Sequence, residues 1–241
     1  MTAGALPPVA LLAGGLGTRI RALAGGTPKV LLPVEGRPFL AHVLDRLSDL
    51  GVEKTVLCLG NAAERIWDAA QTHRPAGMTL IASREETPLG TGGAIRRALD
   101  ELPETFFIMN GDTFLEVPLR ALLTVHRRAR AVLTLSLVRS EEAAEKGSVR
   151  ITPEGRVLDF AEKIADGTGL VNAGVYVAQA RLFADRPKDR PVSLEREIVP
   201  EAIRGGETVI GEVVDGVFVD IGLPESYLRV RDQLPRGRGR S

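Results

Sequence analysis

Short apolar runs alternate with amphipathic stretches of helical period along the first half of this chain, and this alternation constrains the fold more than any other feature. Strands are predicted at residues 9–12, 55–59, 78–82 and 105–109, and helices at residues 39–50, 62–71 and 94–99. The first helix shows the pattern most clearly, because its apolar residues recur at helical spacing and Gly51 can end it. Repeated strand-helix units form a mainly parallel sheet flanked by helices, an α/β fold that binds ligands beyond the carboxyl ends of its strands.

The second half of the chain departs from this alternation. Apolar residues at 149–151 and 157–160 flank the turn sequence Pro153-Glu154-Gly155, which predicts a hairpin and hence a small antiparallel subregion. A further strand is predicted at residues 171–178, and a closing helix is predicted at residues 224–234. Ser193 is placed to cap one more helix, whose first turns carry glutamates.

Composition limits the number of domains and the classes of partner. The chain has 241 residues, 44% of them hydrophobic, which is enough to bury one sizeable core. We therefore expect one domain over residues 1–234 and a disordered basic tail at residues 235–241. The 31 basic and 31 acidic residues cancel, so the net charge favours neither nucleic acid nor an anionic membrane, and neither partner is expected.

The start of the chain lacks the basic region and apolar core of a signal peptide, and no apolar stretch reaches about 18 residues. We therefore expect a cytoplasmic protein. Cys58 is the single cysteine and has no partner for an intrachain disulfide. Because it lies inside an apolar run, we assign it to core packing.

A glycine-rich loop follows the first predicted strand, where residues 12–19 read LAGGLGTR and Pro28-Lys29 comes shortly after. Glycines let backbone N–H groups approach phosphate oxygens, and Arg19 and Lys29 add positive charge where a polyphosphate would lie. A dinucleotide-binding loop needs a glycine where Ile20 stands, and a Walker A loop needs Gly-Lys-Ser/Thr. The loop therefore predicts a nucleoside triphosphate site of another class.

Two aspartates follow apolar runs and are candidates for a metal site. Asp112, in Asn110-Gly111-Asp112-Thr113, follows the strand at residues 105–109, which places its carboxylate at the carboxyl edge of the sheet. Asp220, in Val219-Asp220-Ile221-Gly222, repeats this arrangement near the end of the chain. Two carboxylates can share one Mg²⁺ with phosphate oxygens and water, although each sequence alone is also typical of a turn.

Taken in order, these motifs resemble those of the sugar-1-phosphate nucleotidyltransferases, with further matches at residues 88–95 (PLGTGGAI), 110–114 (NGDTF) and 220–227 (DIGLPESY). The resemblance covers roughly residues 8 to 230, and it is closest to the group that acts on D-glycero-α-D-manno-heptose 1-phosphate with GTP. It implies a Rossmann-like nucleotidyltransferase fold and the transfer of a nucleotidyl group, with Mg²⁺, from a nucleoside triphosphate to a sugar 1-phosphate. Pyrophosphate and a nucleotide-activated sugar are the implied products, and a homo-oligomer is left open.

The resemblance also implies a role for individual residues. Arg19 would stabilise the pyrophosphate, Lys29 would bridge phosphates, Lys163 would hold the phosphate of the sugar, and Asp112 and Asp220 would bind Mg²⁺. The implied nucleotide-binding residues are Leu12, Ala13, Gly14, Gly15, Gly17, Thr18, Glu85, Gly90 and Thr91. The implied sugar-phosphate-binding residues are Gly147, Glu162, Lys163 and Asn172. The implied catalytic residues are Arg19, Lys29, Asp112 and Lys163.

One position bears on the choice of base. Relatives that bind uridine nucleotides tend to place a glutamine five residues before the glycine that matches Gly90, and here that position holds Glu85. A carboxylate only accepts hydrogen bonds, and guanine presents two adjacent N–H donors to it. We hypothesise that Glu85 selects guanine; the other interpretation is that Glu85 and Glu86 form a solvated charged turn.

Other functions fit parts of the pattern. A uridylyl- or thymidylyltransferase acting on a glucose, mannose or amino-sugar 1-phosphate would share the phosphate and metal residues. A glycosyltransferase commonly has Asp-x-Asp at the metal strand, and Asn110-Gly111-Asp112 lacks the first aspartate. A non-catalytic nucleotide-sensing protein would not need the full set of leaving-group and metal contacts. Ile164 stands where many relatives have proline, a departure that touches the sugar side.

Overall fold

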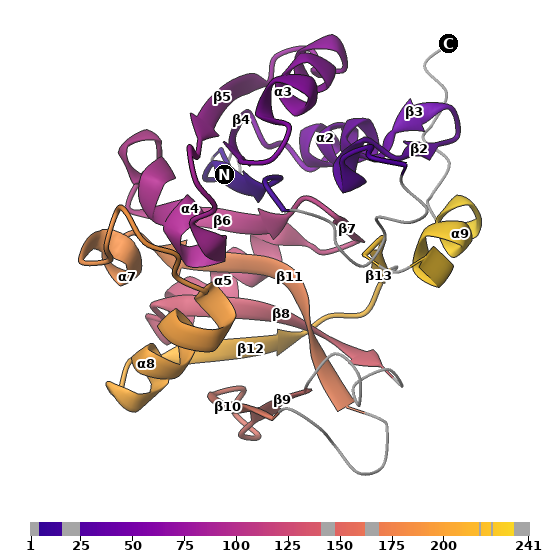
Figure 1. The fold of residues 1–241 in the computed structure, drawn as a ribbon. Coiled ribbons are helices and arrows are strands. Elements are labelled where there is room, and N and C mark those ends of the chain that lie inside the picture. The colour runs from indigo at the N-terminus through magenta and orange to yellow at the C-terminus, as the bar shows by residue number, and fades with distance from the viewer. Residues whose placement is uncertain are drawn as a thin grey trace.

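A seven-stranded sheet runs through the middle of the molecule, in the order β12-β8-β11-β6-β1-β4-β5 (Figure 1). The computed structural model describes residues 5–15, 25–140, 148–161, 169–216, 218–222 and 224–233. All strands of this sheet share one direction except β11, which is antiparallel to both β6 and β8. Their bounds are β1 (Val9–Leu12), β4 (Lys54–Leu59), β5 (Thr79–Arg84), β6 (Thr105–Asn110), β8 (Leu133–Ser140), β11 (Gly169–Gln179) and β12 (Val209–Val213). The predicted mainly parallel sheet is confirmed.

Helices cover both faces of the sheet. Successive strand residues point to opposite faces, and Val9 and Leu11 of β1 accordingly pack in one buried cluster while Ala10 packs in the other. Helices α2 (Phe39–Asp49), α3 (Ala63–Thr72) and α5 (Leu119–Ala129) pack in the first cluster. Helices α4 (Gly90–Ala98), α7 (Arg181–Ala184) and α8 (Val199–Arg204) pack in the second. No helix among the described residues is both long enough and apolar enough to cross a membrane.

Most predicted elements of the first half are present, with small shifts at their ends. The helix predicted at residues 39–50 is α2, and it ends where Gly51 takes a φ of +86°. The helix predicted at residues 94–99 begins earlier, at Gly90, and residues from Leu99 onward form the 3-10 turn η3 (Leu99–Glu101). Glycines are poor helix formers, so the sequence pattern marked this helix only from Ala94. Strands β8 and β12 were not predicted.

Small sheets complete the fold. Strands β9 (Ser148–Ile151) and β10 (Val157–Ala161) form the predicted antiparallel hairpin. Strands β7 (Thr113–Leu115) and β13 (Phe218–Asp220) pair antiparallel, as do β2 (Pro33–Val34) and β3 (Arg37–Pro38). Helix α9 (Pro224–Gln233) is the predicted closing helix, whereas the predicted tail at residues 235–241 lies outside the described residues.

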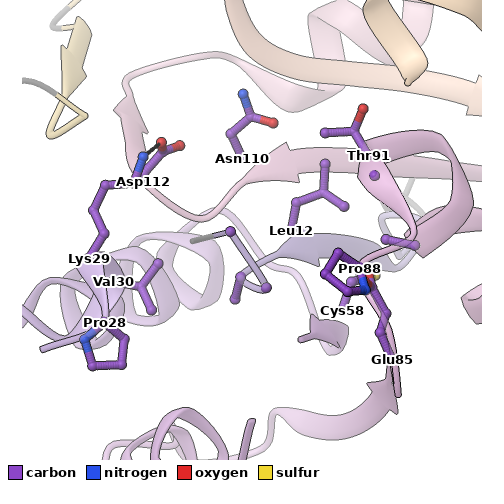
Figure 2. Close-up of a pocket in the computed structure, with 15 residues that line it drawn as sticks. Leu12, Pro28, Lys29, Val30, Cys58, Glu85, Pro88, Thr91, Asn110 and Asp112 are labelled. Carbon is purple, nitrogen blue, oxygen red and sulfur yellow. Dashed lines mark hydrogen bonds and ion pairs between the residues drawn. The ribbon is translucent and has the colours of Figure 1, made fainter. Parts of the chain in front are cut away.

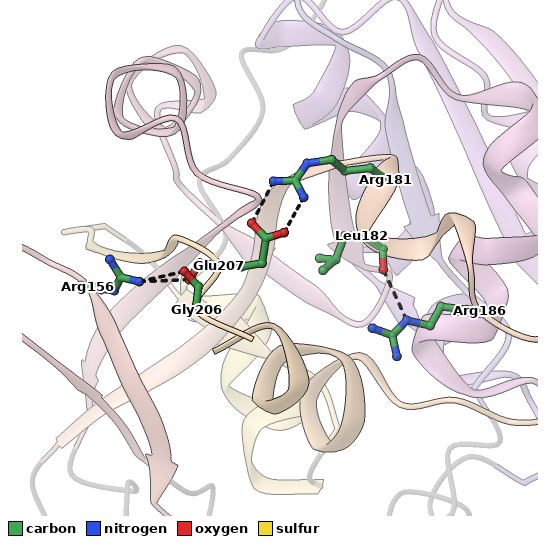
Figure 3. Close-up of polar contacts among 6 residues, drawn as sticks. All are labelled: Arg156, Arg181, Leu182, Arg186, Gly206 and Glu207. Atoms are coloured by element: carbon green, nitrogen blue, oxygen red, sulfur yellow. Dashed lines mark hydrogen bonds and ion pairs between the residues drawn. The ribbon is translucent and has the colours of Figure 1, made fainter. Parts of the chain in front are cut away.

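Arginine side chains hold the turn before β12 against two neighbouring elements (Figure 3). Arg181, at the start of α7, makes a bidentate ion pair with Glu207, with 2.9 Å between Nη2 and Oε2. Arg156, which directly precedes β10, donates to the backbone carbonyls of Gly206 and Glu207, each at 3.3 Å. The Arg181 side chain is 60% exposed, so we expect its ion pair to contribute only about 0.2–1 kcal/mol.

Candidate active site

A cavity of about 290 Å³ opens at the carboxyl ends of β1 and β6, where the α/β topology predicts a ligand site (Figure 2). Its walls come from the loop after β1, the 3-10 turn η2 (Lys29–Leu31), the residues after β5 and the start of α4. The residues that line the cavity and that the sequence predicted for the site are Leu12, Ala13, Gly14, Gly15, Lys29, Glu85, Gly90, Thr91 and Asp112. These residues come from five separate stretches of sequence, and the fold brings them together.

Backbone hydrogen bonds tie the loop after β1 to its neighbours. Asn61 N–H donates to the Gly14 carbonyl at 3.3 Å, and Gly111 N–H donates to the Leu12 carbonyl at 2.9 Å. A Cβ on Gly14 would lie 2.7 Å from the backbone nitrogen of Gly60, whereas a Cβ on Gly15 would meet nothing within 4 Å. Close packing against Gly60 therefore requires a glycine at position 14. Gly15 lines the cavity and has room for a side chain.

The glycine cluster at the start of α4 serves packing as well. Gly90 has a φ of +70°, and a Cβ there would lie 2.7 Å from the carbonyl oxygen of Val192. The same oxygen accepts hydrogen bonds from Gly92 N–H at 2.9 Å and Gly93 N–H at 3.2 Å. Two of the N–H groups at this helix start are thus satisfied within the protein, so the ligand-facing contribution of the cluster lies with Gly90 and Thr91.

Lys29 and Asp112 form an ion pair at one end of the cavity (Figure 2). Their side chains are 18% and 24% exposed, so the pair is partly shielded from water yet open to a ligand. The Asp112 carbonyl accepts the N–H of Ile221 at 3.0 Å, and Asp220 pairs with Thr113 in the β7-β13 ladder. This ladder brings the backbone of the second predicted metal ligand next to the first.

The chemistry of these donors suits Mg²⁺. This ion takes one or two carboxylates and completes its octahedron with water and phosphate oxygens, rather than requiring an all-protein cage. Within the part of the chain that the structure describes, no group of three or more His, Cys, Asp or Glu side chains is placed to hold a metal. Asp112, paired with the cation of Lys29 and beside the backbone of Asp220, is a carboxylate of the kind that Mg²⁺ takes as a ligand.

Glu85 lies at the other end of the cavity, below Pro88 in Figure 2. One of its carboxylate oxygens accepts the N–H of Leu89 at 2.9 Å. Burial raises the pKa of Glu85, while the Leu89 hydrogen bond and the charge of Arg97 oppose the rise. Glu86 is exposed, but Glu85 is only partly so, which does not match a fully solvated turn.

Cys58 packs in the core, as predicted, and also contributes to the cavity wall. Burial raises the pKa of its thiol to about 12, with the charge of Glu85 adding to the effect. The thiolate is therefore scarce at neutral pH, and Cys58 supplies shape rather than a nucleophile.

Asn172 belongs to a chain of hydrogen bonds that the sequence did not predict. Its Nδ2 donates to the hydroxyl of Tyr176 at 2.6 Å, and that hydroxyl donates to Glu195 at 3.2 Å. Glu195 in turn accepts a hydrogen bond from Thr91 of the cavity wall at 2.8 Å. In a regular strand, residues four apart lie about 13 Å from each other, so the spacing from Asn172 to Tyr176 does not predict this contact. It arises because the register of β11 shifts between these two residues, where Gly174 has a φ of +72°.

Six predicted site residues lie outside the described part of the chain: Gly17, Thr18, Arg19, Gly147, Glu162 and Lys163. The side chain of Asp220 is likewise not described. Their roles remain predictions.

Comparison with known proteins gives consistent matches. A sequence model described as nucleotidyl transferase matches residues 9–237. Mannose-1-phosphate guanylyltransferase of Mycobacterium tuberculosis is 38% identical over 232 residues, which are 94% of this chain and 64% of that protein. D-glycero-alpha-D-manno-heptose 1-phosphate guanylyltransferase of Aneurinibacillus thermoaerophilus is 33% identical over 225 residues, which are 93% of this chain and 96% of that protein. The chain thus spans less than two thirds of the first relative's length and nearly all of the second's.

The fold also matches a solved structure. HddC from Yersinia pseudotuberculosis, complexed with GMP-PN, superimposes with a TM-score of 0.85 and 31% sequence identity. The match covers 94% of this chain and 99% of that one.

Proposed function

Because this chain belongs to the nucleotidyl transferase family, we propose that it transfers GMP from GTP to a sugar 1-phosphate and releases pyrophosphate. One observation carries the proposal. The glycine loop after β1, the Lys29–Asp112 ion pair and the carboxylate of Glu85 share one cavity at the carboxyl edge of the sheet. The cavity therefore offers a cation and a metal-binding oxygen at one end, and an acceptor for a base at the other.

The reaction joins two anions, so positioning and charge neutralisation supply most of its rate. An oxygen of the sugar phosphate forms a bond to the α-phosphorus, and the bond from that phosphorus to the oxygen bridging the α- and β-phosphates breaks. The electron pair of that bond leaves with the pyrophosphate. The ammonium group of Lys29 carries three hydrogens, so it can hold Asp112 and a phosphate oxygen at the same time.

Mg²⁺, bound by Asp112 and Asp220, would supply positive charge to the triphosphate oxygens. We assign Arg19 to the leaving pyrophosphate and Lys163 to the phosphate of the sugar. The loop that contains Gly17 and Thr18 completes the nucleotide site in this proposal.

The remaining assignments concern the sugar. We propose that Glu162 and Asn172 bind its hydroxyl groups and that Gly147 lies beside its phosphate.

Base selection is assigned to Glu85. Among the described residues its hydrogen-bond donor is Leu89, and each carboxylate oxygen has two acceptor sites, so capacity remains for the N1–H and N2–H groups of guanine. Pro88 and Leu12 line the same cavity and provide apolar surface for the ring. A substitution that removes the charge of Glu85 should therefore weaken the binding of GTP more than the binding of the other nucleotides.

The sugar that we favour is D-glycero-α-D-manno-heptose 1-phosphate. The chain spans 96% of the length of the heptose 1-phosphate guanylyltransferase of Aneurinibacillus thermoaerophilus. Mannose 1-phosphate is the second candidate, because the relative named for it has the higher identity, 38%.

The proposal is tested by pyrophosphate release with GTP, ATP, UTP or dTTP against heptose, mannose and glucose 1-phosphates, each with Mg²⁺. Turnover that is greatest with GTP and the heptose phosphate, and lost in Asp112→Asn, is the expected result. Turnover with UTP or dTTP alone would refute the assignment to GTP. Absence of turnover with every pair, together with measurable nucleotide binding, would favour a sensing protein instead.

A further inference from the structure

We propose that Glu195 is a positioning residue that sets the hydrogen-bond directions of Thr91 and Asn172, on the nucleotide side and the sugar side of the site. The proposal rests on the function proposed above, and it concerns a glutamate two residues after Ser193, the predicted helix cap. Glu195 lies in η4 (Leu194–Ile198), a single π-helical turn that begins after Ser193. Its carboxylate accepts hydrogen bonds from three hydroxyl groups.

Two chains of hydrogen bonds begin at Glu195, and we call each of them an arm. The first arm runs from Glu195 to Thr91. Oγ1 of Thr91 donates to Oε2 of Glu195 at 2.8 Å and accepts the N–H of Leu194 at 2.8 Å. A hydroxyl group has one hydrogen, and here that hydrogen is committed to the carboxylate. Thr91 lines the cavity, so a ligand atom that reaches its oxygen meets an acceptor and must itself donate.

The second arm runs through Tyr176, which is fully buried. Burial and the charge of Glu195 raise the pKa of Tyr176 well above its ordinary value, so its hydroxyl keeps its hydrogen and donates it to Oε1 of Glu195. The hydroxyl then accepts from Nδ2 of Asn172 at 2.6 Å. Oδ1 of Asn172 accepts the N–H of Gly174 at 3.1 Å, which fixes the orientation of the amide.

This arrangement leaves the second Nδ2 hydrogen of Asn172 as the donor that the amide can offer to a ligand. The arm lies beside the cavity, because a Cβ on Gly174 would come within 2.6 Å of Nδ2 of Asn110, which lines it. The charge of Asp112 also contributes to the raised pKa of Tyr176, as expected for a neighbour. The carboxylate of Glu195 therefore makes Thr91 an acceptor on the nucleotide side of the site and Asn172 a donor on the sugar side.

Replacing Glu195 by glutamine keeps the shape but breaks this pattern, since an amide has one acceptor end and one donor end. If the NH₂ group faces Thr91, the threonine hydroxyl must turn its hydrogen toward the cavity. If it faces Tyr176, the tyrosine hydrogen loses its acceptor. Either orientation disturbs one arm, and a glutamine that exchanges between them disturbs both.

A matched control lies in the same turn. Glu197 accepts the N–H of Ser193 at 2.8 Å and takes no part in the two arms. Glu197→Gln removes one negative charge from the same helical turn and keeps an acceptor for Ser193. It therefore separates loss of charge from loss of the hydrogen-bond pattern.

The experiment compares Glu195→Gln, Tyr176→Phe, their double variant and Glu197→Gln. Thermal unfolding checks the fold, calorimetry measures GTP affinity, and steady-state kinetics give KM and kcat for each substrate. Tyr176→Phe should raise KM for the sugar phosphate by about tenfold, the worth of one hydrogen bond, and leave GTP affinity within about twofold. Glu195→Gln should raise KM for the sugar phosphate about five- to tenfold, and it should weaken the affinity for GTP by a similar factor.

Two further results decide the proposal. The double variant should raise KM for the sugar phosphate no more than the larger of the two single effects, because both changes act on the same arm. Glu197→Gln should behave as the unmodified protein does. Additive effects in the double variant, or equal effects of Glu195→Gln and Glu197→Gln, would overturn the proposal. Absence of turnover in the unmodified protein would refute the proposed function instead, while GTP calorimetry would still test the Thr91 arm.

Discussion

His126 gives a pH dependence of stability that can be worked out from its contacts. It lies in α5 and is 1% exposed. Its Nε2 lies 2.8 Å from Nε2 of Gln179, a nitrogen that only donates, so the ring accepts there and its Nδ1–H donates to Thr134 at 3.0 Å. Protonation would place two donors face to face. Burial, with a contribution from the charge of Arg127, lowers the pKa of His126 from 6.5 to about 4.

The sign and size of the effect follow from this difference. Between pH 6.5 and about 4 the unfolded chain binds a proton at this histidine and the folded chain does not. Acidification therefore favours unfolding across that window, and stability rises again as the pH rises. The expected loss in the free energy of unfolding is about 2 kcal/mol between pH 7 and pH 5, and about 3 kcal/mol by pH 4.

Urea denaturation of the unmodified protein and of His126→Gln at pH 7 and pH 5 measures this loss. The glutamine variant can start from a lower stability, so the informative quantity is the change with pH and not the absolute value. We expect the two proteins to differ by about 2 kcal/mol in that change. His73→Gln controls for the removal of a histidine elsewhere in the chain. Equal pH dependence of His126→Gln and the unmodified protein would refute the reasoning.

Three further predictions concern the site and the turn before β12. Gly90→Ala should lower the free energy of unfolding by about 2 kcal/mol or more, measured in urea, because alanine is strained at a φ of +70° and its Cβ would meet Val192; no loss would contradict this packing. Lys29→Met should lower kcat by about a hundredfold, because a phosphate-neutralising cation is lost; full activity would contradict its role. Glu207→Ala should cost at most about 1 kcal/mol, because its Arg181 pair is exposed, and the loss should shrink in 1 M salt.

The alternation of apolar runs in the first half of the chain was enough to predict the mainly parallel sheet. Strands β1, β4 and β6 are buried on both faces, so uninterrupted apolar runs such as the one in β6 mark them clearly. Strand β8 was missed because Thr134 and Ser136 interrupt its apolar run. Both are buried, and their hydroxyl groups are satisfied by His126 and by the carbonyl of Val175, contacts that only the folded chain provides.

The candidate site could be predicted where a motif follows a strand. Lys29, Glu85 and Asp112 were identified from sequence and line one cavity in the structure. Glu195 was not identified, because its contacts depend on two tertiary features. One is the shifted register of β11 before Tyr176, and the other is the close approach of the segment around Val192 to α4. Neither leaves a local pattern in the sequence.

The central claim is that an oxygen of a sugar 1-phosphate attacks the α-phosphorus of GTP, and oxygen labelling tests it most directly. Sugar 1-phosphate with ¹⁸O in its phosphoryl oxygens would be incubated with the protein, unlabelled GTP and Mg²⁺, and the products followed by ³¹P NMR. The account predicts a labelled oxygen bridging the two phosphorus atoms of the nucleotide sugar, and pyrophosphate without label. Label in the pyrophosphate, or a nucleotide sugar whose bridging oxygen is unlabelled, would contradict it.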